Sequence, residues 1–254
     1  MVAIHFASRF YDVEGFRKGR SSLLPVEVEE MGDVTGKALL HLQCHFGLDT
    51  LSWARNGAIV TGVDFSHQAI ETAKRLAIET GVEARFVESD LLALENALEG
   101  EFDIVFSSYG VLCWLPDLQS WAKTIAHFLK PGGFFYLAED HPSAQIIDAR
   151  SSDRIQIAYP YFTGGKPTLF RDLGTYTDRN AKLDNSTTYE WTHTMGDVLN
   201  SLIEAGLRVE FVHEFPFSFF KRHEDMEQKE DGTWHFKDHN VSFPMVFTLR
   251  ARKP

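Results

Sequence analysis

Short apolar runs alternate with longer amphipathic segments between Lys37 and Glu139, and this order constrains the fold more than any other feature of the chain. Apolar runs bounded by turn residues are typical of buried strands, and the amphipathic segments between them are typical of crossover helices. The alternation therefore predicts parallel strands joined by helices. We expect strands at 38–43, 58–64, 84–89, 102–108 and 134–140 and helices at 48–56, 67–81 and 116–133, the last with a Pro-Gly-Gly stop.

The pattern changes after His141. Residues 142–190 are rich in aromatic residues, Thr, Asp and Gly, which predicts strands and turns inserted into the α/β scheme as a lid. A helix is then expected at 195–206, followed by a strand at 207–215, a second insertion at 216–240 and a last strand at 243–252. Because no helix separates the last two strands, they are expected to pair antiparallel. The sequence predicts a single domain over residues 1–254.

The composition restricts the class of protein. A chain of 254 residues that is 44% hydrophobic can bury one large core. A net charge of -11 argues against nucleic acid as a partner, since non-specific binding to nucleic acid depends on lysine and arginine. Cys44 and Cys113 are interpreted as reduced packing residues. The amino terminus does not resemble a signal peptide and no apolar run is long enough to span a bilayer, so we expect a cytoplasmic protein that does not enter the membrane.

The stretch "LLHLQCHFGLDT" (39–50) runs from the first predicted strand into the first predicted helix, with a single glycine at the junction. In open parallel sheets, ligands bind beyond the carboxyl ends of the strands, beside the first strand and the helix that follows it. Asp64 closes the second strand, where an acidic residue can bind a ribose diol, and Asp90 closes the third strand, where it can meet an adenine edge. Together these features predict an adenosine site.

At this point the chain resembles the class I S-adenosylmethionine-dependent methyltransferases. The resemblance rests on "LLHLQCHFG", "VTGVDFS", "ESDLL", "FDIVFSSYGVLCWL" and "LKPGGFFYLAE", which occur in the family's order, and it covers 37–139 and 195–252. The family implies an α/β fold with a seven-stranded, mostly parallel, doubly wound sheet whose last strand is antiparallel. It also implies S-adenosylmethionine as cofactor and S-adenosylhomocysteine as product.

The chain departs from the family in the loop after the first strand. Members commonly have an acidic residue two places before a Gly-x-Gly-x-Gly run, whereas this chain has His41, Gln43, His45 and Gly47 at those positions. We expect Gly47 to keep the closest approach to the cofactor, because S-adenosylmethionine has no phosphate that would require the other glycines. Gln43 and His45 then point aside or touch the methionine portion. His41 is interpreted as a packed strand histidine.

The resemblance implies a set of cofactor contacts on the matching motifs. Asp64 is expected to bind ribose, although it could instead cap the helix after it, and the same two interpretations apply to Asp90. His45 is either a structural residue or a cofactor contact. The predicted cofactor-binding residues are Tyr11, Gln43, His45, Gly47, Asp64, Phe65, Ser66, Asp90, Leu91 and Ser107.

Methyl transfer from a sulfonium requires mainly that the acceptor be held on the methyl axis, and a general base is needed only when the acceptor carries a proton. The predicted catalytic residues are His141, Tyr109, Glu139 and His193. His141 is the preferred base because it follows the fifth strand, but "EDHP" can also be a plain turn. The spacing of the other histidines fits no metal motif, so no metal is predicted.

Residues 1–36 are expected to cover the cofactor, as a leading helix does in related enzymes. Tyr11 and Phe16 then pack on the mouth of the site, or else attach the helix to the sheet. The function predicted is methyl transfer to a small-molecule acceptor. Two alternatives stay open, namely a module that binds S-adenosylmethionine or S-adenosylhomocysteine without catalysis, and a nicotinamide oxidoreductase of related topology. The sequence identifies neither the acceptor nor the oligomeric state.

Overall fold

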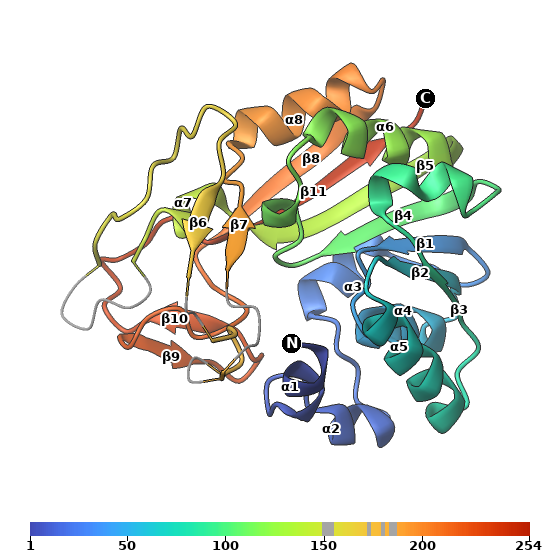
Figure 1. Cartoon of the computed structure of the whole chain (residues 1–254), viewed down its shortest axis with the longest axis horizontal. Helices are drawn as coiled ribbons and strands as arrows, with labels where there is room; N and C mark the ends of the chain where they lie inside the picture. The colour runs from blue at the N-terminus through green and yellow to red at the C-terminus, as the bar shows by residue number, and fades with distance from the viewer. Residues whose placement is uncertain (149–154, 172–173, 179–180, 183–186) are drawn as a thin grey trace.

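The computed structural model contains one seven-stranded sheet with helices on both faces (Figure 1). The structure describes residues 1–148, 155–171, 174–178, 181–182 and 187–254. The sheet strands are β1 (Ala38–Leu42), β2 (Ile59–Asp64), β3 (Arg85–Glu88), β4 (Phe102–Ser108), β5 (Leu129–Asp140), β8 (Arg208–Phe215) and β11 (Val246–Arg252). The helices of the main alternation are α4 (Leu48–Arg55), α5 (His67–Thr80), η1 (Leu91–Asn96), η2 (Leu112–Trp114), α6 (Leu118–Phe128) and α8 (Met195–Glu204).

The strand order is β3-β2-β1-β4-β5-β11-β8. The pairs among β1 to β5 are parallel, and β11 lies antiparallel between β5 and β8, with Leu249 opposite Leu137 on one side and Val212 on the other. The predicted fold class is therefore confirmed, including the antiparallel last strand. The order reverses between β1 and β4, so the ligand site expected for such a sheet lies beyond the ends of these two strands.

Alternate residues of the strands pack into two different hydrophobic cores. Leu40 belongs to a cluster that includes Trp121 of α6 and Leu202 of α8, whereas Leu39 belongs to a cluster that includes Trp53 of α4. Successive side chains of a strand point to opposite faces, so helices are needed on both. Each fully buried large apolar side chain contributes about 1.5–3 kcal/mol. The strand ends are thus held on a rigid framework.

One predicted boundary is wrong. The helix expected over 116–133 ends at Phe128, and β5 begins at Leu129, so that Pro131-Gly132-Gly133 lies inside a strand. Gly132 N donates to Lys253 O at 2.9 Å, and a Cβ added to Gly133 would lie 2.9 Å from the Asp103 carbonyl oxygen. Close approach of β4 explains Gly133 and a left-handed backbone, with a φ of 79°, explains Gly132, where the local pattern indicated only a stop.

The remaining elements lie outside the sheet. The amino-terminal segment contains α1 (Val2–Ala7), α2 (Val13–Arg17) and α3 (Pro25–Met31), and the first insertion contains α7 (Pro142–Gln145) and the hairpin of β6 (Thr168–Phe170) and β7 (Thr188–Glu190). The second insertion contains the hairpin of β9 (Met226–Gln228) and β10 (Trp234–Phe236). Both hairpins gather beyond the ends of β4 and β5 (Figure 1).

Candidate functional site

The loop from Gln43 to Gly47 joins β1 to α4, and every second residue in it has a left-handed backbone. Gln43, His45 and Gly47 have φ angles of 55°, 50° and 82°. This conformation costs a non-glycine residue about 1–2 kcal/mol, so Gln43 and His45 must be held by their surroundings. The loop thus has positive φ at the positions where the resembling sequences commonly have glycine.

Contacts on two sides hold this loop. Gln43 Nε2 donates to Val111 O at 3.1 Å, which ties the loop to the segment after β4. Cys44 N donates to Val63 O at 2.8 Å and His45 N donates to Asp64 Oδ2 at 2.9 Å, which tie it to the end of β2. These bonds offset the cost of the left-handed backbone and explain how the chain dispenses with two glycines.

Gly47 is required by packing as well as by its backbone angle. A Cβ at this position would lie 2.8 Å from two ring atoms of Phe86 and 3.0 Å from the Ala73 Cβ. The side chain of any other residue would therefore enter the core between the loop, β3 and α5. A Gly47→Val variant consequently cannot test the predicted approach to the cofactor, because it would disturb the fold itself.

The amino-terminal segment and the first insertion meet over this loop. His5 Nδ1 lies 2.8 Å from His45 Nε2, the ring of Tyr11 lies 4.7 Å from that of Phe46, and the Tyr11 and Tyr176 hydroxyls are hydrogen-bonded. Burial lowers the pKa of His45 to about 3 and that of His5 to about 4. Both imidazoles are thus neutral at neutral pH, and one N–H serves the bond between them.

Asp64 lies at the end of β2 and binds two backbone amides. Its Oδ1 accepts from Ser66 N and its Oδ2 accepts from His45 N, each at 2.9 Å. Burial raises the pKa of Asp64, and the two N–H donors oppose the rise. Since a carboxylate has about four acceptor positions, two stay open for a ligand. Ser66 caps α5 by accepting from Ala69 N at 3.3 Å, and the side chain of Phe65 is 75% exposed beside them.

Asp90 and Leu91 begin η1 beyond β3. Asp90 Oδ1 accepts from Leu92 N at 2.8 Å, which is the capping interaction weighed against adenine binding. Leu91 is buried in the core that includes Leu94 and Val63, whereas Leu92 is 41% exposed. The side chain of Leu91 therefore supports the fold, and Leu92 is the exposed member of the pair.

Two buried polar atoms near the switch point lack a hydrogen-bond partner among the described residues. They are Ser107 Oγ, at the end of β4, and Gln43 Oε1, in the loop after β1. His41 is buried too, but its Nδ1 pairs with Thr50 Oγ1 at 2.8 Å and burial lowers its pKa to about 3. His41 is thus the packed, neutral strand histidine that was expected.

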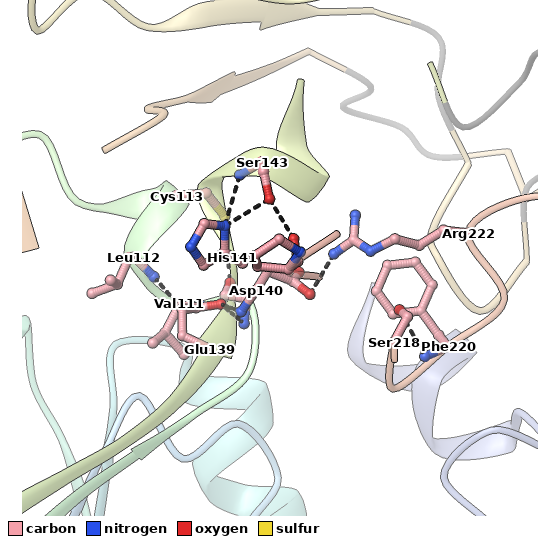
Figure 2. A network of polar contacts seen from close by, with 12 residues as sticks. Val111, Leu112, Cys113, Glu139, Asp140, His141, Ser143, Ser218, Phe220 and Arg222 are labelled. Atoms are coloured by element: carbon pink, nitrogen blue, oxygen red, sulfur yellow. Dashed lines mark hydrogen bonds and ion pairs between the residues drawn. The ribbon is translucent and has the colours of Figure 1, made fainter. Parts of the chain in front are cut away.

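Glu139 holds the segment after β4. Its carboxylate accepts from Gly110 N, Val111 N, Leu112 N and Asp140 N at 2.6–3.0 Å, and the residue is 1% exposed (Figure 2). Burial raises its pKa to about 7 and these N–H donors oppose the rise. A carboxylate with all of its acceptor positions occupied argues against the predicted catalytic role and for a structural one.

His141 caps α7. Its Nδ1 accepts from Ser143 N at 3.1 Å (Figure 2), so the ring proton is on Nε2, which lies 2.9 Å from Glu214 Oε1. The residue is 6% exposed, and burial lowers its pKa. A general base needs a free lone pair, and that of His141 is taken by a helix-terminal N–H. The geometry therefore favours the turn interpretation of "EDHP" over the predicted base.

The second insertion is tied to the end of β5 by a buried ion pair. Asp140 pairs with Arg222, and their side chains are 13% and 14% exposed. The Arg222 guanidinium also lies 4.5 Å from the centre of the Phe220 ring (Figure 2). This pair fixes the segment carrying Phe219 and Phe220 near the strand end, where an acceptor is expected.

Tyr109 follows β4 with a φ of 26°, an unusual value for a residue with a side chain. Its ring centre lies 3.6 Å from that of Phe219, and burial with the nearby charge of Glu27 on α3 raises the pKa of its hydroxyl. Glu27 is completely buried, and burial with the nearby charge of Asp49 raises its pKa to about 8. Tyr109 thus joins the amino-terminal segment, β4 and the second insertion.

His193 lies between β7 and α8 and donates to a backbone carbonyl. Its Nε2 lies 2.7 Å from Leu115 O, and since a carbonyl can only accept, Nε2 carries the proton. The lone pair of this neutral ring is then on Nδ1. Burial lowers the pKa of His193, which keeps the ring neutral at neutral pH.

Sequence reasoning missed four residues that the structure brings to this region, namely His5, Glu27, Asp49 and Tyr176. Only Asp49 carried a usable signal, as an acidic residue two places after the loop glycine. Within the described ranges there is no cluster of three or more His, Cys, Asp or Glu residues suited to a metal, and no helix long and apolar enough to cross a membrane.

Comparison with known proteins identifies similar sequences. A family profile described as a methyltransferase domain matches residues 40–137. The ubiquinone biosynthesis O-methyltransferase of Escherichia fergusonii is 33% identical over 131 residues, which are 50% of this chain and 54% of that protein. The chain thus spans about half the length of the curated relatives that it matches.

Solved structures resemble nearly the whole chain. A S-adenosylmethionine-dependent methyltransferase from Mesorhizobium loti is 22% identical with a TM-score of 0.61, covering 93% of this chain and 99% of that one. A second, from Methanosarcina mazei, is 18% identical with a TM-score of 0.57, covering 91% and 98%. At these identities the likeness establishes the fold alone.

Proposed function

We propose that the chain is a class I S-adenosylmethionine-dependent methyltransferase that transfers the methyl group of S-adenosylmethionine to a small-molecule acceptor. The observation that carries the proposal is the left-handed loop 43–47, bound through His45 N to Asp64 at the switch point of the sheet. This is the place where open α/β sheets bind nucleoside ligands.

The residues at this place fit the cofactor. Asp64 keeps acceptor positions for a ribose diol, and the exposed ring of Phe65 offers a face on which adenine can stack. Gln43 Oε1 and Ser107 Oγ supply buried polar atoms that lack a partner among the described residues. When bound, S-adenosylmethionine supplies a methyl group on a positively charged sulfur, so the leaving group is already activated.

The protein's contribution is then to position the acceptor and exclude water. Tyr109 and Phe219 bring β4 and the second insertion together, and Tyr176 of the first insertion has its ring centre 6.0 Å from that of Phe220. Four aromatic rings from three segments suit an organic acceptor in a concave pocket. This supports a small molecule over a nucleic acid, in line with the net charge of -11.

A general base is needed if the acceptor is a hydroxyl group, as the name of the Escherichia fergusonii O-methyltransferase suggests for that relative. Of the four predicted catalytic residues we assign this role to His193, whose Nδ1 keeps its lone pair. A His193→Gln variant should lower kcat by about 100-fold and leave the affinity for S-adenosylhomocysteine unchanged. Equal losses in both would instead indicate a structural role.

Calorimetric titration with S-adenosylmethionine and S-adenosylhomocysteine tests the cofactor. Phe65→Ala should weaken both ligands by about 10-fold, because loss of stacking on a base costs roughly 1–3 kcal/mol. Ile78→Ala, which removes an 81% exposed side chain from α5, is the matched control and should change nothing. Absence of binding to the folded wild-type chain would overturn the assignment.

A non-catalytic binding module stays the alternative, because the loop lacks the usual glycines. Transfer of a labelled methyl group to any component of a metabolite extract separates the two, since a binding module would retain the ligand without converting it. Binding of NAD in place of S-adenosylmethionine would revive the nicotinamide oxidoreductase.

A further inference from the structure

Asp49 lies in the first turn of α4, two residues after Gly47, and its carboxylate is held by two hydroxyl groups. Its Oδ1 accepts from Ser22 Oγ at 2.6 Å and its Oδ2 accepts from Ser108 Oγ at 2.9 Å. Ser22 comes from the segment between α2 and α3, and Ser108 ends β4. Three parts of the chain therefore fix the orientation of one carboxylate beside the nucleotide loop.

No positive side chain neutralises this carboxylate within the ranges that the structure describes. The groups that Asp49 influences by its charge are Tyr11, Tyr109 and Tyr176, each with its pKa raised, together with Cys44 and Glu27. Asp49 is half-buried, and burial raises its pKa while the two hydroxyl donors oppose the rise. A partly buried carboxylate without a counter-charge is costly, because hydroxyl groups replace only part of the water that it gave up. A protein tolerates such an unfavourable free energy most readily where a bound ligand supplies the missing positive charge.

Glu27, the nearest acidic neighbour in this set, carries a proton at neutral pH because burial and the charge of Asp49 raise its pKa to about 8. His41 is neutral for the reason given above and lies 3.4 Å from Ser108 Oγ through its Nε2. The acidic residue that resembling sequences commonly place at position 41 is thus absent here. Asp49 is the acidic residue that instead lies two places after the loop glycine.

The tyrosines around Asp49 come from three separate segments. Tyr11 precedes α2, Tyr109 follows β4 and Tyr176 belongs to the first insertion. Aromatic rings attract cations through their faces, so rings combined with a buried carboxylate form an environment for a cation. S-adenosylmethionine has two candidate groups, the sulfonium and the α-ammonium of its methionine portion.

We propose that Asp49, held by Ser22 and Ser108, is the counter-charge for a cationic group of the cofactor. This inference rests on the proposed function, since it takes the cofactor as given. It assigns to Asp49 the negative charge that the chain lacks at position 41, and it makes the contact between the amino-terminal segment and β4 part of the binding site.

Titration of Asp49→Asn with three ligands tests the proposal. S-adenosylmethionine carries both positive groups, S-adenosylhomocysteine carries only the ammonium, and 5′-methylthioadenosine carries neither. If Asp49 binds the ammonium, the variant should weaken the first two ligands by about 10- to 100-fold and leave the third unchanged. If it binds the sulfonium, S-adenosylmethionine should weaken more than S-adenosylhomocysteine.

The proposal would be overturned if Asp49→Asn changed the affinity for all three ligands equally, or changed it for none of them, because neither result depends on the charge of the ligand. Failure of the wild-type chain to bind any of them would instead overturn the proposed function. Glu99→Gln removes the same formal charge at an exposed position and should bind as wild type. Ser22→Ala keeps the charge but frees the carboxylate, so it should weaken the two charged ligands by only a few-fold.

Discussion

Glu27 should make the chain less stable as the pH rises. The residue is 0% exposed, its Oε2 accepts from Leu24 N at 2.8 Å, and its pKa is raised from 4.5 to about 8. The folded chain therefore holds a proton that the unfolded chain releases between these values. The free energy of unfolding falls through that window, and linkage gives a loss of roughly 3 kcal/mol between about pH 5 and pH 8 from this group alone.

The Glu27→Gln variant isolates the contribution of Glu27 to the pH dependence of the free energy of unfolding. The amide oxygen can still accept from Leu24 N and the amide nitrogen can donate to the Tyr109 hydroxyl, but the group no longer titrates. Urea unfolding followed by circular dichroism at several pH values should give a variant that gains on the wild type by roughly 3 kcal/mol as the pH rises from about 5 to 8. The control variant Glu29→Gln, at an exposed position of the same helix, should show the same pH dependence of the free energy of unfolding as the wild type. A parallel profile for Glu27→Gln as well would refute the reasoning.

Three further predictions follow from the loop and the end of β5. Gly47→Ala should lower the free energy of unfolding by about 1–3 kcal/mol, measured by urea unfolding, because its Cβ would overlap the Phe86 ring. Glu139→Gln should cost about 2–4 kcal/mol in the same assay, because four backbone N–H groups would share one neutral acceptor. His141→Asn should keep methyl transfer within about two-fold, because asparagine caps helices equally well, and a loss of kcat alone would restore His141 as the base.

The sheet could be predicted because its determinants are local. Apolar runs and amphipathic segments predicted the strands β1 to β5 and the helices α4, α5 and α6, although not the short helices η1 and η2. The missing helix before the last strand predicted the antiparallel end of the sheet. The prediction for the Pro-Gly-Gly segment was wrong because the need for Gly133 comes from a neighbouring strand and not from the local sequence. Gly133 is small so that the Asp103 carbonyl can approach, and no helix-stop rule contains that information.

The predicted site was limited in the same way. Asp64 ends β2 and Asp90 lies two residues beyond β3, near the strand ends that the alternation indicated. The preference for His141 rested on its place after the fifth strand and on its ordinary pKa, and it did not include the contact made by Nδ1. That nitrogen accepts from Ser143, only two residues away, so "HPS" was readable as a helix cap. The contacts of His5 and Tyr176 could not be predicted, because these residues reach His45 and Tyr11 from distant parts of the chain.

The loop after β1 gives the clearest lesson about motifs. A glycine pattern is a common means of reaching an alternating left-handed backbone, but the backbone itself is what a bound nucleoside would meet. Here two side chains accept a cost of about 1–2 kcal/mol each, and the bonds of Gln43 to Val111 and of His45 to Asp64 offset it. The side chains also provide a contact, because the ring of His45 hydrogen-bonds to His5 and so joins the loop to the amino-terminal segment. A loop built from glycines would have no such contact to offer, so the side chains of this loop couple it to the amino-terminal segment.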